Sequence, residues 1–299
     1  MSETHSCSEE ERPICDYEGS RYRTDFWEGR GRTYEDRVER HALRQLLPAG
    51  GRRLLDVGAG FGRLADMYAG YQEVVLFDYS RSQLEYARAR LGDERFVYVA
   101  GDIYRMPLAG NAVDAAVMVR VLHHLVDVPA ALAHLARVLC PQGTLVLEFA
   151  NKRHLKNMLR YALGKGVNPF ERAPYEFAAL HFDFHPAWVA QQLTRAGFEI
   201  HARRSVSLFR SQALKRILPV PFLVMMDGLL QRAAAPLALG PSMFLCAKSQ
   251  KGGQEGPAEE LLFRCPSCGY EPLMPGEQGV ECSRCHALWP IENGIYLFK

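Results

Sequence analysis

The feature that most limits the fold of this chain is an alternation that runs from Leu54 to Phe149. Short runs of β-branched and aliphatic residues alternate there with longer segments whose apolar residues recur every three or four positions. This pattern is typical of parallel strands joined by crossover helices in a sheet covered on both faces. It predicts an α/β fold, with strands at 54–57, 74–77, 96–100, 115–119 and 144–149 and helices at 82–91 and 129–139.

The pattern loosens after Phe149 and then resumes, which predicts a helix over 186–196 and strands over 198–204 and 242–248. Pro141-Gln142-Gly143 is expected to be the stop before the fifth strand. We expect a flexible N-terminus, one main domain with two irregular insertions, a glycine-rich linker and a small C-terminal module. Their respective ranges are 1–20, 21–248 with insertions at about 151–185 and 211–240, 249–260, and 261–299.

Composition limits the class of protein further. Of 299 residues, 48% are hydrophobic and 23% are charged, so the chain can bury a large core. The net charge of +2 argues against wholesale wrapping of nucleic acid, although a local basic patch stays possible. Residues 1–20 lack the basic start and the apolar run of a secretory signal, and the apolar stretch from Ile217 to Leu230 is too short to span a bilayer. These features predict a cytoplasmic protein.

The first predicted strand leads into a glycine-rich turn, Asp56-Val57-Gly58-Ala59-Gly60-Phe61-Gly62-Arg63. Missing side chains let a ligand approach the backbone, so such a turn is suited to cradle part of a cofactor. A nicotinamide-binding turn would have glycine or alanine where Arg63 stands, which weakens the dinucleotide interpretation.

Two more carboxylates follow the next strands. Asp78 closes the second and Asp102 follows the third, so the carboxyl edge of the sheet is expected to gather polar groups near the turn. On these residues the sequence resembles the class I S-adenosylmethionine-dependent methyltransferases, over about residues 30 to 248. The resemblance implies a Rossmann-like, seven-stranded sheet whose last strand is antiparallel, with S-adenosylmethionine as the cofactor. It assigns the methionine part to Asp56, Gly58, Gly60 and Gly62, the ribose to Asp78, and the adenine to Tyr79, Asp102 and Ile103.

The resemblance also suggests where catalysis and closure take place. His123 and His124, just past the fourth strand, are candidate general bases, and loop packing is the competing interpretation. The arginines and aromatics of 22–34 form either a lid over the cofactor or a patch packed on the outside of the domain.

Two segments in the insertions bear on the acceptor. Lys152 to Lys165 predicts a basic amphipathic helix, suited to an anionic acceptor, a membrane surface or a phosphate backbone, or simply solvated on its outer face. The apolar stretch from Ile217 to Leu230 indicates a cap on an apolar acceptor pocket, a patch on lipid, or ordinary core.

Four cysteines near the C-terminus form the pattern Cys-x2-Cys-x13-Cys-x2-Cys. Four thiolates on two tight turns can surround Zn²⁺ tetrahedrally, and so small a module needs such a site for stability. The pattern predicts a structural zinc ribbon with ligands Cys265, Cys268, Cys282 and Cys285. Its flanking sequence resembles the small zinc-ribbon activator of tRNA, rRNA and release-factor methyltransferases, here fused to the chain.

Together these features predict an S-adenosylmethionine-dependent methyltransferase with a small-molecule or lipid-like acceptor. Peripheral contact with a membrane is one expected interaction. Two alternatives stay open: an RNA or protein methyltransferase whose ribbon presents the substrate, and a cofactor-binding scaffold without catalysis.

Overall fold

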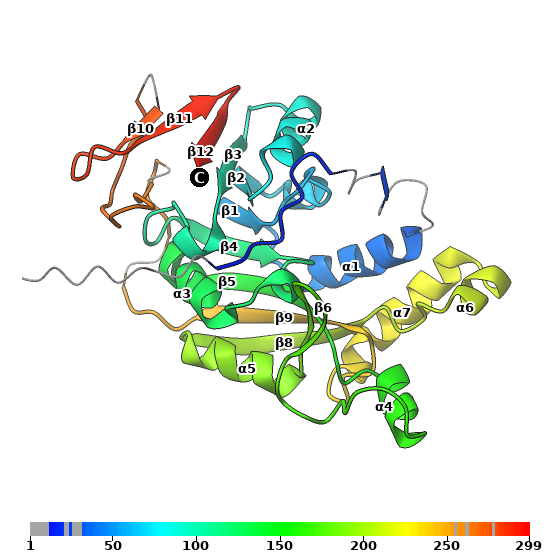
Figure 1. The fold of residues 1–299 in the computed structure, drawn as a ribbon. Helices are drawn as coiled ribbons and strands as arrows, with labels where there is room; N and C mark the ends of the chain where they lie inside the picture. The colour runs from blue at the N-terminus through cyan, green and yellow to red at the C-terminus, as the bar shows by residue number, and fades with distance from the viewer. Residues whose placement is uncertain (1–11, 21–23, 26–31, 254–255, 261–262, 277–278) are drawn as a thin grey trace, which may run out of the picture.

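The computed structural model describes residues 12–20, 24–25, 32–253, 256–260, 263–276 and 279–299. A single large sheet runs through the described chain, with helices on both faces (Figure 1). Its seven strands in the main domain are β1 (Gly51–Val57), β2 (Tyr71–Asp78), β3 (Phe96–Gly101), β4 (Val113–Met118), β5 (Leu139–Ala150), β8 (Phe198–Val206) and β9 (Ser242–Ser249). Three further strands come from the C-terminal module, namely β10 (Gly279–Glu281), β11 (Leu288–Glu292) and β12 (Ile295–Phe298).

The α-helices are α1 (Thr33–Leu46), α2 (Arg81–Leu91), α3 (Val128–Val138), α4 (Leu155–Ala162), α5 (Pro186–Arg195), α6 (Gln212–Ile217) and α7 (Val220–Ala234). Short 3-10 turns are η2 (Ala65–Tyr68), η3 (Ile103–Arg105) and η4 (Leu122–His124), and a small hairpin is formed by β6 (Tyr175–Ala178) and β7 (His181–Asp183).

The strand order confirms the predicted fold class. In the main domain it is β3-β2-β1-β4-β5-β9-β8, with parallel pairing from β3 to β5. The late strand β9 pairs antiparallel with β5 on one side and with β8 on the other. Each of the seven predicted strands overlaps an observed one, because doubly buried strands leave a clear apolar signature in the sequence.

The predicted stop before β5 differs from what the structure contains. Pro141, Gln142 and Gly143 lie inside β5 as an irregularity, where the pairing with β4 shifts from Val113↔Leu139 to Ala115↔Thr144. Gln142 adopts a φ of 60° there. The turn-forming residues therefore mark a bulge, which locally interrupts the pairing without ending the strand.

Two hydrophobic clusters fill the two faces of the sheet. Alternating residues of β1 belong to different clusters: Leu55 packs with α3 and α5, whereas Leu54 packs with α1, α2 and α7. Figure 1 shows α3 and α5 on one side of the strands and α1 with α7 on the other. Because the strands from β3 to β5 run parallel, their carboxyl ends lie together at one edge, where ligands bind in folds of this kind.

Tyr34, expected either in a lid or in a patch on the outside of the domain, is instead part of the core between α1 and α7. Its hydroxyl donates a hydrogen bond of 2.6 Å to the buried Asp227 carboxylate, which also accepts from the backbone amide of Leu208 at 2.7 Å. Most of the remaining lid prediction, including Tyr22, Arg23, Phe26, Trp27, Arg30 and Gly31, falls outside the described residues.

The C-terminal module extends the main sheet. β12 pairs in parallel with β3, from Ile295↔Tyr98 to Phe298↔Gly101, and β11 and β10 follow in antiparallel register. Asn293 and Gly294 have φ angles of 49° and 69°, which suit the tight turn between β11 and β12. Within the module, Phe263 packs against Phe298 of β12, with the two ring centroids 5.1 Å apart.

The two insertions lie beside β5, β9 and β8. The first insertion differs from the predicted basic helix. The predicted basic helix is shorter, and α4 buries none of its residues. Lys152 is buried instead of belonging to the basic face, and its ammonium donates to the Ala173 carbonyl at 2.6 Å. Among the described helices, none has both the length and the apolar content needed to cross a membrane.

Candidate functional site

A cavity opens at the carboxyl edge of the sheet, where β1, β2, β3 and β4 end. Its wall includes the end of β1 and the glycine turn, the end of β2, the segment after β3 and the segment after β4. Among the residues predicted to bind the cofactor, six line this cavity, namely Asp56, Gly58, Gly60, Asp78, Tyr79 and Ile103. Segments far apart in the sequence therefore meet at the carboxyl edge of the sheet, as the predicted order of strands required.

The glycine turn owes its shape to residues without a side chain. Gly58 and Gly60 have φ angles of 70° and 52°, in the left-handed region that other residues avoid. A Cβ on Gly58 would come within 2.1 Å of Val121, whereas one on Gly60 would meet nothing within 4 Å. Gly60 therefore presents bare backbone to open space, while Gly58 permits close packing against the segment after β4. Gly62 is not part of the cavity wall and lies against α2 instead.

Two carboxylates reach the cavity from neighbouring strand ends. Asp78 accepts hydrogen bonds from the backbone amides of Gly60 at 2.7 Å and Ser80 at 2.8 Å, so it ties the glycine turn to β2. Burial raises the pKa of Asp78 to about 6, although these two hydrogen bonds act to lower it. Burial likewise raises the pKa of Asp56 to about 7, with a further contribution from the negative charge of Asp78 and an opposing one from Arg63. The cavity thus holds two poorly solvated carboxyl groups beside the glycine turn.

Asp102 is not among the residues that line the cavity, and its predicted part in binding the adenine stays a prediction. One oxygen accepts from the backbone amide of Tyr104 at 2.8 Å, and the other lies 3.3 Å from Arg105 Nε. The carboxylate therefore caps η3, a role that its position before a short helical turn favours. Its neighbours Ile103 and Tyr104 line the cavity in its place.

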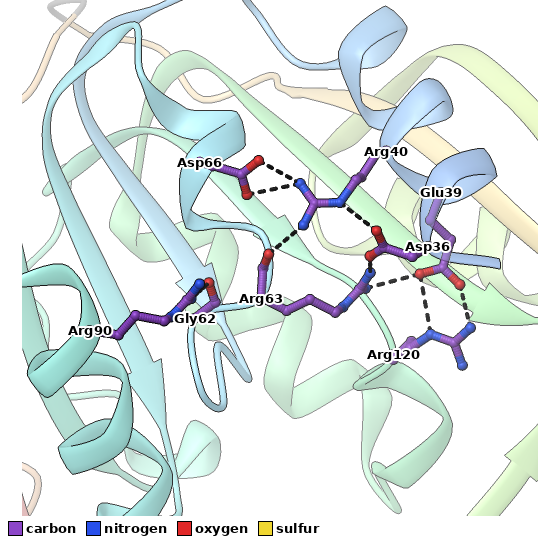
Figure 2. A network of polar contacts seen from close by, with 8 residues as sticks. All are labelled: Asp36, Glu39, Arg40, Gly62, Arg63, Asp66, Arg90 and Arg120. Atoms are coloured by element: carbon purple, nitrogen blue, oxygen red, sulfur yellow. Dashed lines mark hydrogen bonds and ion pairs between the residues drawn. The ribbon is translucent and has the colours of Figure 1, made fainter. Parts of the chain in front are cut away.

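A network of buried charges supports the glycine turn from the side of α1. Glu39, at the centre of the network, is almost fully buried. Its carboxylate forms ion pairs with Arg63, whose Nη2 is 2.9 Å away, and with the guanidinium of Arg120 (Figure 2). The two arginines hold the pKa of Glu39 below its usual range in spite of its burial. Arg63 and Arg120 both line the cavity, so α1 fixes two cationic side chains at its wall.

Further arginines hold the backbone of the turn. Arg40 donates to the Arg63 carbonyl at 2.6 Å, and Arg90 donates to the Gly62 carbonyl at 2.5 Å (Figure 2). These bonds satisfy carbonyls that the irregular turn would otherwise leave unpaired.

Part of the segment expected to be a flexible N-terminus covers the cavity. Residues 12–20 pack against the domain, and Pro13, Ile14, Cys15 and Tyr17 line the cavity. Arg12 Nε lies 2.8 Å from the Asp127 carboxylate at the start of α3. The described part of this segment therefore forms one wall of the site, and the flexible N-terminus stays a prediction.

The two candidate bases occupy different positions. His124 lines the cavity, whereas His123 does not. His124 Nδ1 lies 2.9 Å from the Leu180 carbonyl, which can only accept, so Nδ1 carries the proton and Nε2 accepts from the Tyr17 hydroxyl at 3.2 Å. Burial lowers the pKa of His124, which leaves its imidazole neutral at pH 7. His124 is thus the better placed candidate to accept a proton from a bound molecule.

His123 is packed behind His124 and is poorly suited to contact a ligand. The two ring centroids are 4.0 Å apart, and the buried Nδ1 of His123 finds no hydrogen-bond partner among the described residues. Burial lowers its pKa well below the usual value. His181 of β7 contacts His124 edge-on, with the centroids 4.7 Å apart, so the first insertion reaches this corner of the cavity.

The four cysteines of the ribbon converge in one place. Their sulfur atoms all lie within 4.8 Å of one another, and two of the pairs, Cys265 with Cys285 and Cys268 with Cys282, are 3.6 and 3.5 Å apart. A tetrahedral zinc with bonds of about 2.3 Å would separate its sulfurs by about 3.8 Å. The donor set and its geometry therefore fit a four-thiolate metal site with no open position.

Each cysteine pair lies on a tight turn of the same design. The amide of Gly269 donates to the Cys265 carbonyl at 2.9 Å, and the amide of His286 donates to the Cys282 carbonyl at 2.8 Å. Gly269 and His286 both have positive φ, of 70° and 57°. These four residues bring the paired thiols to the same side of the module.

The fold and the cavity define the class of protein. Residues 55–147 match the family described as "Methyltransferase domain". With the strand order and the glycine turn, this match places a class I S-adenosylmethionine-dependent methyltransferase domain in the chain. The sequence-based recognition of that class is confirmed.

Individual relatives share this domain over part of their length. A demethylmenaquinone methyltransferase from Clavibacter sepedonicus is 36% identical over 106 residues, which are 35% of this chain and 43% of the relative. The chain thus matches less than half the length of the first curated relatives. The structure of an S-adenosylmethionine-dependent methyltransferase from Mesorhizobium loti matches 71% of this chain and 97% of its own, with a TM-score of 0.55 and 22% identity.

A second solved structure also shares the fold. It comes from a complex between the Trm112 methyltransferase activator of Haloferax volcanii and a methyltransferase, and it matches 72% of this chain and 90% of its own, with a TM-score of 0.52 and 17% identity. At such identities both solved structures establish the fold alone.

Among the residues of the cavity wall that sequence reasoning missed are Tyr17, Arg63 and Arg120. Arg63 adjoins the glycine turn and Arg120 follows β4, so their place at the strand ends was a usable signal. Tyr17 gave no such signal, because it lies in a short polar segment outside any periodic pattern.

Proposed function

We propose that this chain transfers a methyl group from S-adenosylmethionine to a small, apolar acceptor bound in the cavity at the carboxyl edge of the sheet. The observation that carries the proposal is that the glycine turn, the carboxyl groups of Asp56 and Asp78, and several apolar side chains all line one cavity. Val121, Leu125, Ile14 and Leu64 are among those apolar residues. S-adenosylmethionine, when bound, supplies a methyl group attached to positively charged sulfur.

The carboxylates and the glycine turn are suited to the donor. Asp56 would attract the cationic methionine end beside the exposed backbone of Gly60, and Asp78 would accept the ribose hydroxyls. Tyr79 and Ile103 line the same wall and would contact the adenine. Since both carboxylates are poorly solvated, their attraction for a cation is stronger than it would be in water.

Alignment of the acceptor, more than acid–base chemistry, is expected to supply the rate. The covering segment 12–20 would exclude water and hold the acceptor in line with the methyl group. Where the acceptor carries a hydroxyl, the neutral Nε2 of His124 would take its proton in place of the one now donated by Tyr17. His123 would hold the His124 ring in position.

The apolar residues of the cavity wall support a small, apolar acceptor over a polar one. The relative from Clavibacter sepedonicus is named for demethylmenaquinone, an acceptor of that kind. We extend the class of acceptor, not its identity, to this chain.

We further propose that the ribbon binds one structural Zn²⁺ through Cys265, Cys268, Cys282 and Cys285. The sulfur spacing supports it, and four protein ligands leave no position for a catalytic water. A macromolecular acceptor is the second candidate function, because the ribbon joins the sheet next to β3 and so lies close to the cavity wall.

Calorimetry of donor binding tests the first step. Asp78→Ala should weaken binding of S-adenosylmethionine at least about a hundredfold, as the loss of a buried hydrogen-bonded partner implies. Asp93→Ala is the matched control, since that carboxylate is exposed at the end of α2 and pairs with Arg88. Equal affinity in both variants would refute the ribose assignment.

Transfer from labelled donor into a fractionated cell extract tests the second step. Label in the fraction soluble in organic solvent supports the proposal, and label in RNA or protein supports the second candidate. Donor binding without transfer to any fraction would indicate a scaffold that binds the cofactor without catalysis.

A further inference from the structure

One end of the molecule exposes an unusual number of large apolar side chains. On α4 and the residue that caps it, Leu155, Leu159 and Leu163 recur every four positions and are exposed, Leu163 by 75%. On α6 and α7, Ile217 and Leu229 are 77% and 70% exposed. A helix on the surface of a protein normally turns such a stripe toward the core, and α4 buries nothing among the described residues.

The exposed face of α7 is distinct from the face that packs on α1. Leu223, Asp227, Gln231 and Ala234 are buried at helical spacing. Phe222, Met225 and Leu229 follow a second stripe at spacings of three and four, and each is exposed. Core packing therefore accounts for one side of α7 and leaves the other unexplained.

Positive charge surrounds these apolar residues. Lys156 and Arg160 each follow an exposed leucine of α4 by one position, so they flank the stripe. Residues 152–168 contain no acid, and residues 207–240 contain only Asp227, which is buried. The remaining basic residues of these two segments with exposed side chains are Lys165, Arg210, Arg216 and Arg232.

The two segments form one surface, which we call the basic–apolar surface and define as the exposed side chains of residues 153–165 and 210–237. The amide of Leu155 donates to the Leu239 carbonyl at 3.0 Å, which joins the start of α4 to the end of the α7 segment. Arg210 is close enough to His154 to lower the pKa of that histidine, together with burial and Lys156. Figure 1 shows α4, α6 and α7 at the same end of the molecule.

We propose that the basic–apolar surface docks on an anionic lipid bilayer. Helices with leucines on one side and lysine or arginine beside them lie in the headgroup region, where the apolar side chains enter the acyl boundary and the cations meet lipid phosphates. A phosphate backbone of RNA would satisfy the charges and would leave the exposed leucines in water. The apolar stripe thus favours lipid.

The position of this surface indicates what docking would achieve. α4 follows the carboxyl end of β5, and the same insertion continues to His181, which contacts His124 at the cavity. An apolar acceptor held in the bilayer would therefore meet the protein beside its candidate site. The docking itself does not depend on the proposed function, because it requires neither donor nor acceptor.

Flotation of the full chain with vesicles tests the docking. It should float with vesicles of phosphatidylcholine and phosphatidylglycerol and much less with phosphatidylcholine alone. The double variant Lys156→Gln with Lys165→Gln should lower the partition about thirtyfold, because each cation near an anionic surface contributes about fivefold. Leu159→Ser should lower it about tenfold, and so should Leu229→Ser.

Matched controls separate docking from general effects. Leu288→Ser removes a leucine that is 54% exposed on β11, close to the 57% of Leu159. Arg195→Gln with Lys248→Gln removes two charges near the opposite edge of the sheet, where Lys248 pairs with Thr144 at the start of the regular part of β5. Both controls should float within about twofold of the unchanged chain, and thermal melts should show that all variants fold.

Two outcomes would overturn the proposal. One is flotation that is absent, or that the α4 and α7 variants leave unchanged. The other is retention of single-stranded RNA that the lysine variant abolishes and the leucine variants preserve, with no binding to either kind of vesicle; the surface would then be a nucleic-acid site. Loss of flotation with unchanged methyl transfer to a water-soluble acceptor would separate docking from catalysis.

Discussion

The cavity side of the sheet and the ribbon share one set of strands but are stabilised in different ways. Around the cavity, β1 to β5 bury apolar residues on both faces, and Glu39 joins α1 to the turn through two arginines. The ribbon contributes strands of three to five residues and gathers four thiols. A module of some 40 residues buries too little apolar surface to fold securely alone, so the proposed metal site and the neighbouring sheet would both contribute.

The ribbon nevertheless takes part in the main core. Phe263, Val280 and Phe298 belong to the same hydrophobic cluster as α3 and α5. The two regions therefore differ in what holds them: apolar contacts hold β12, and the proposed zinc would hold the two cysteine turns. The experiments below test whether the two regions are stabilised in these different ways.

Removal of the metal should have the largest effect. Structural zinc contributes on the order of 10 kcal/mol to small domains, so chelation should expose the cysteine turns while β1 to β5 stay folded. Hydrogen exchange should accelerate at the amides of Gly269 and His286 and stay slow at Val75 and Leu145. Unfolding of the whole chain on chelation would show that the two regions are not held separately.

A serine substitution gives the genetic form of the same test. Cys268→Ser should lower the bound zinc below one ion per chain, whereas Cys246→Ser on β9, outside the cluster, should leave it unchanged. Metal analysis of both variants makes the comparison direct.

Loss of the central buried carboxylate should have the next largest effect. Glu39→Gln leaves Arg63 and Arg120 facing a neutral amide, and breaking a buried ion pair in this way costs about 3–5 kcal/mol. Denaturant unfolding of the cavity region would measure the loss. Glu85→Gln, which breaks the exposed pair with Arg81, should cost far less, because solvent screens that pair. Similar values for the two variants would mean that the network contributes no more than a surface pair.

The pH dependence of stability should show the smallest effect. Because burial raises the pKa of Asp56 to about 7, the folded chain keeps a proton that the unfolded chain releases near pH 4. Without ligand, the free energy of unfolding should therefore fall by about 2–4 kcal/mol between about pH 4 and pH 7 through this group.

The variant Asp56→Asn should remove the part of the decline that Asp56 contributes and keep the part that comes from the raised pKa of Asp78. Asp93→Asn, on an exposed carboxylate, should leave the whole decline unchanged. Chemical denaturation at a series of pH values would measure both. A slope unchanged in Asp56→Asn would show that Asp56 is ionised in the folded chain at all these pH values.

The sequence was informative wherever a local pattern determined the structure. Apolar strands such as 74–77, the glycines after β1 and the spacing of the four cysteines each have a short-range chemical cause, and the structure contains all three. Asp56 and Asp78 met at the cavity because parallel strands end at one edge.

The sequence was uninformative where distant segments determine the outcome. The pairing of β12 with β3 joins Ile295 to Tyr98, and neither strand carries a signal for the other. The contact of Glu39 with Arg120 spans 81 positions. Asp102 stood at the predicted strand end, but its carboxylate turned to cap η3, a choice that a local backbone amide decided.

The parallel pairing of β12 has a consequence for how this chain relates to partners. An unpaired edge at β3 would be a template onto which a strand from another protein adds. Here a covalently attached segment occupies that edge, so its local concentration is set by the intervening residues and not by the abundance of a second subunit. The assembly has fixed one-to-one stoichiometry and withstands dilution, and a competing strand would first have to displace β12.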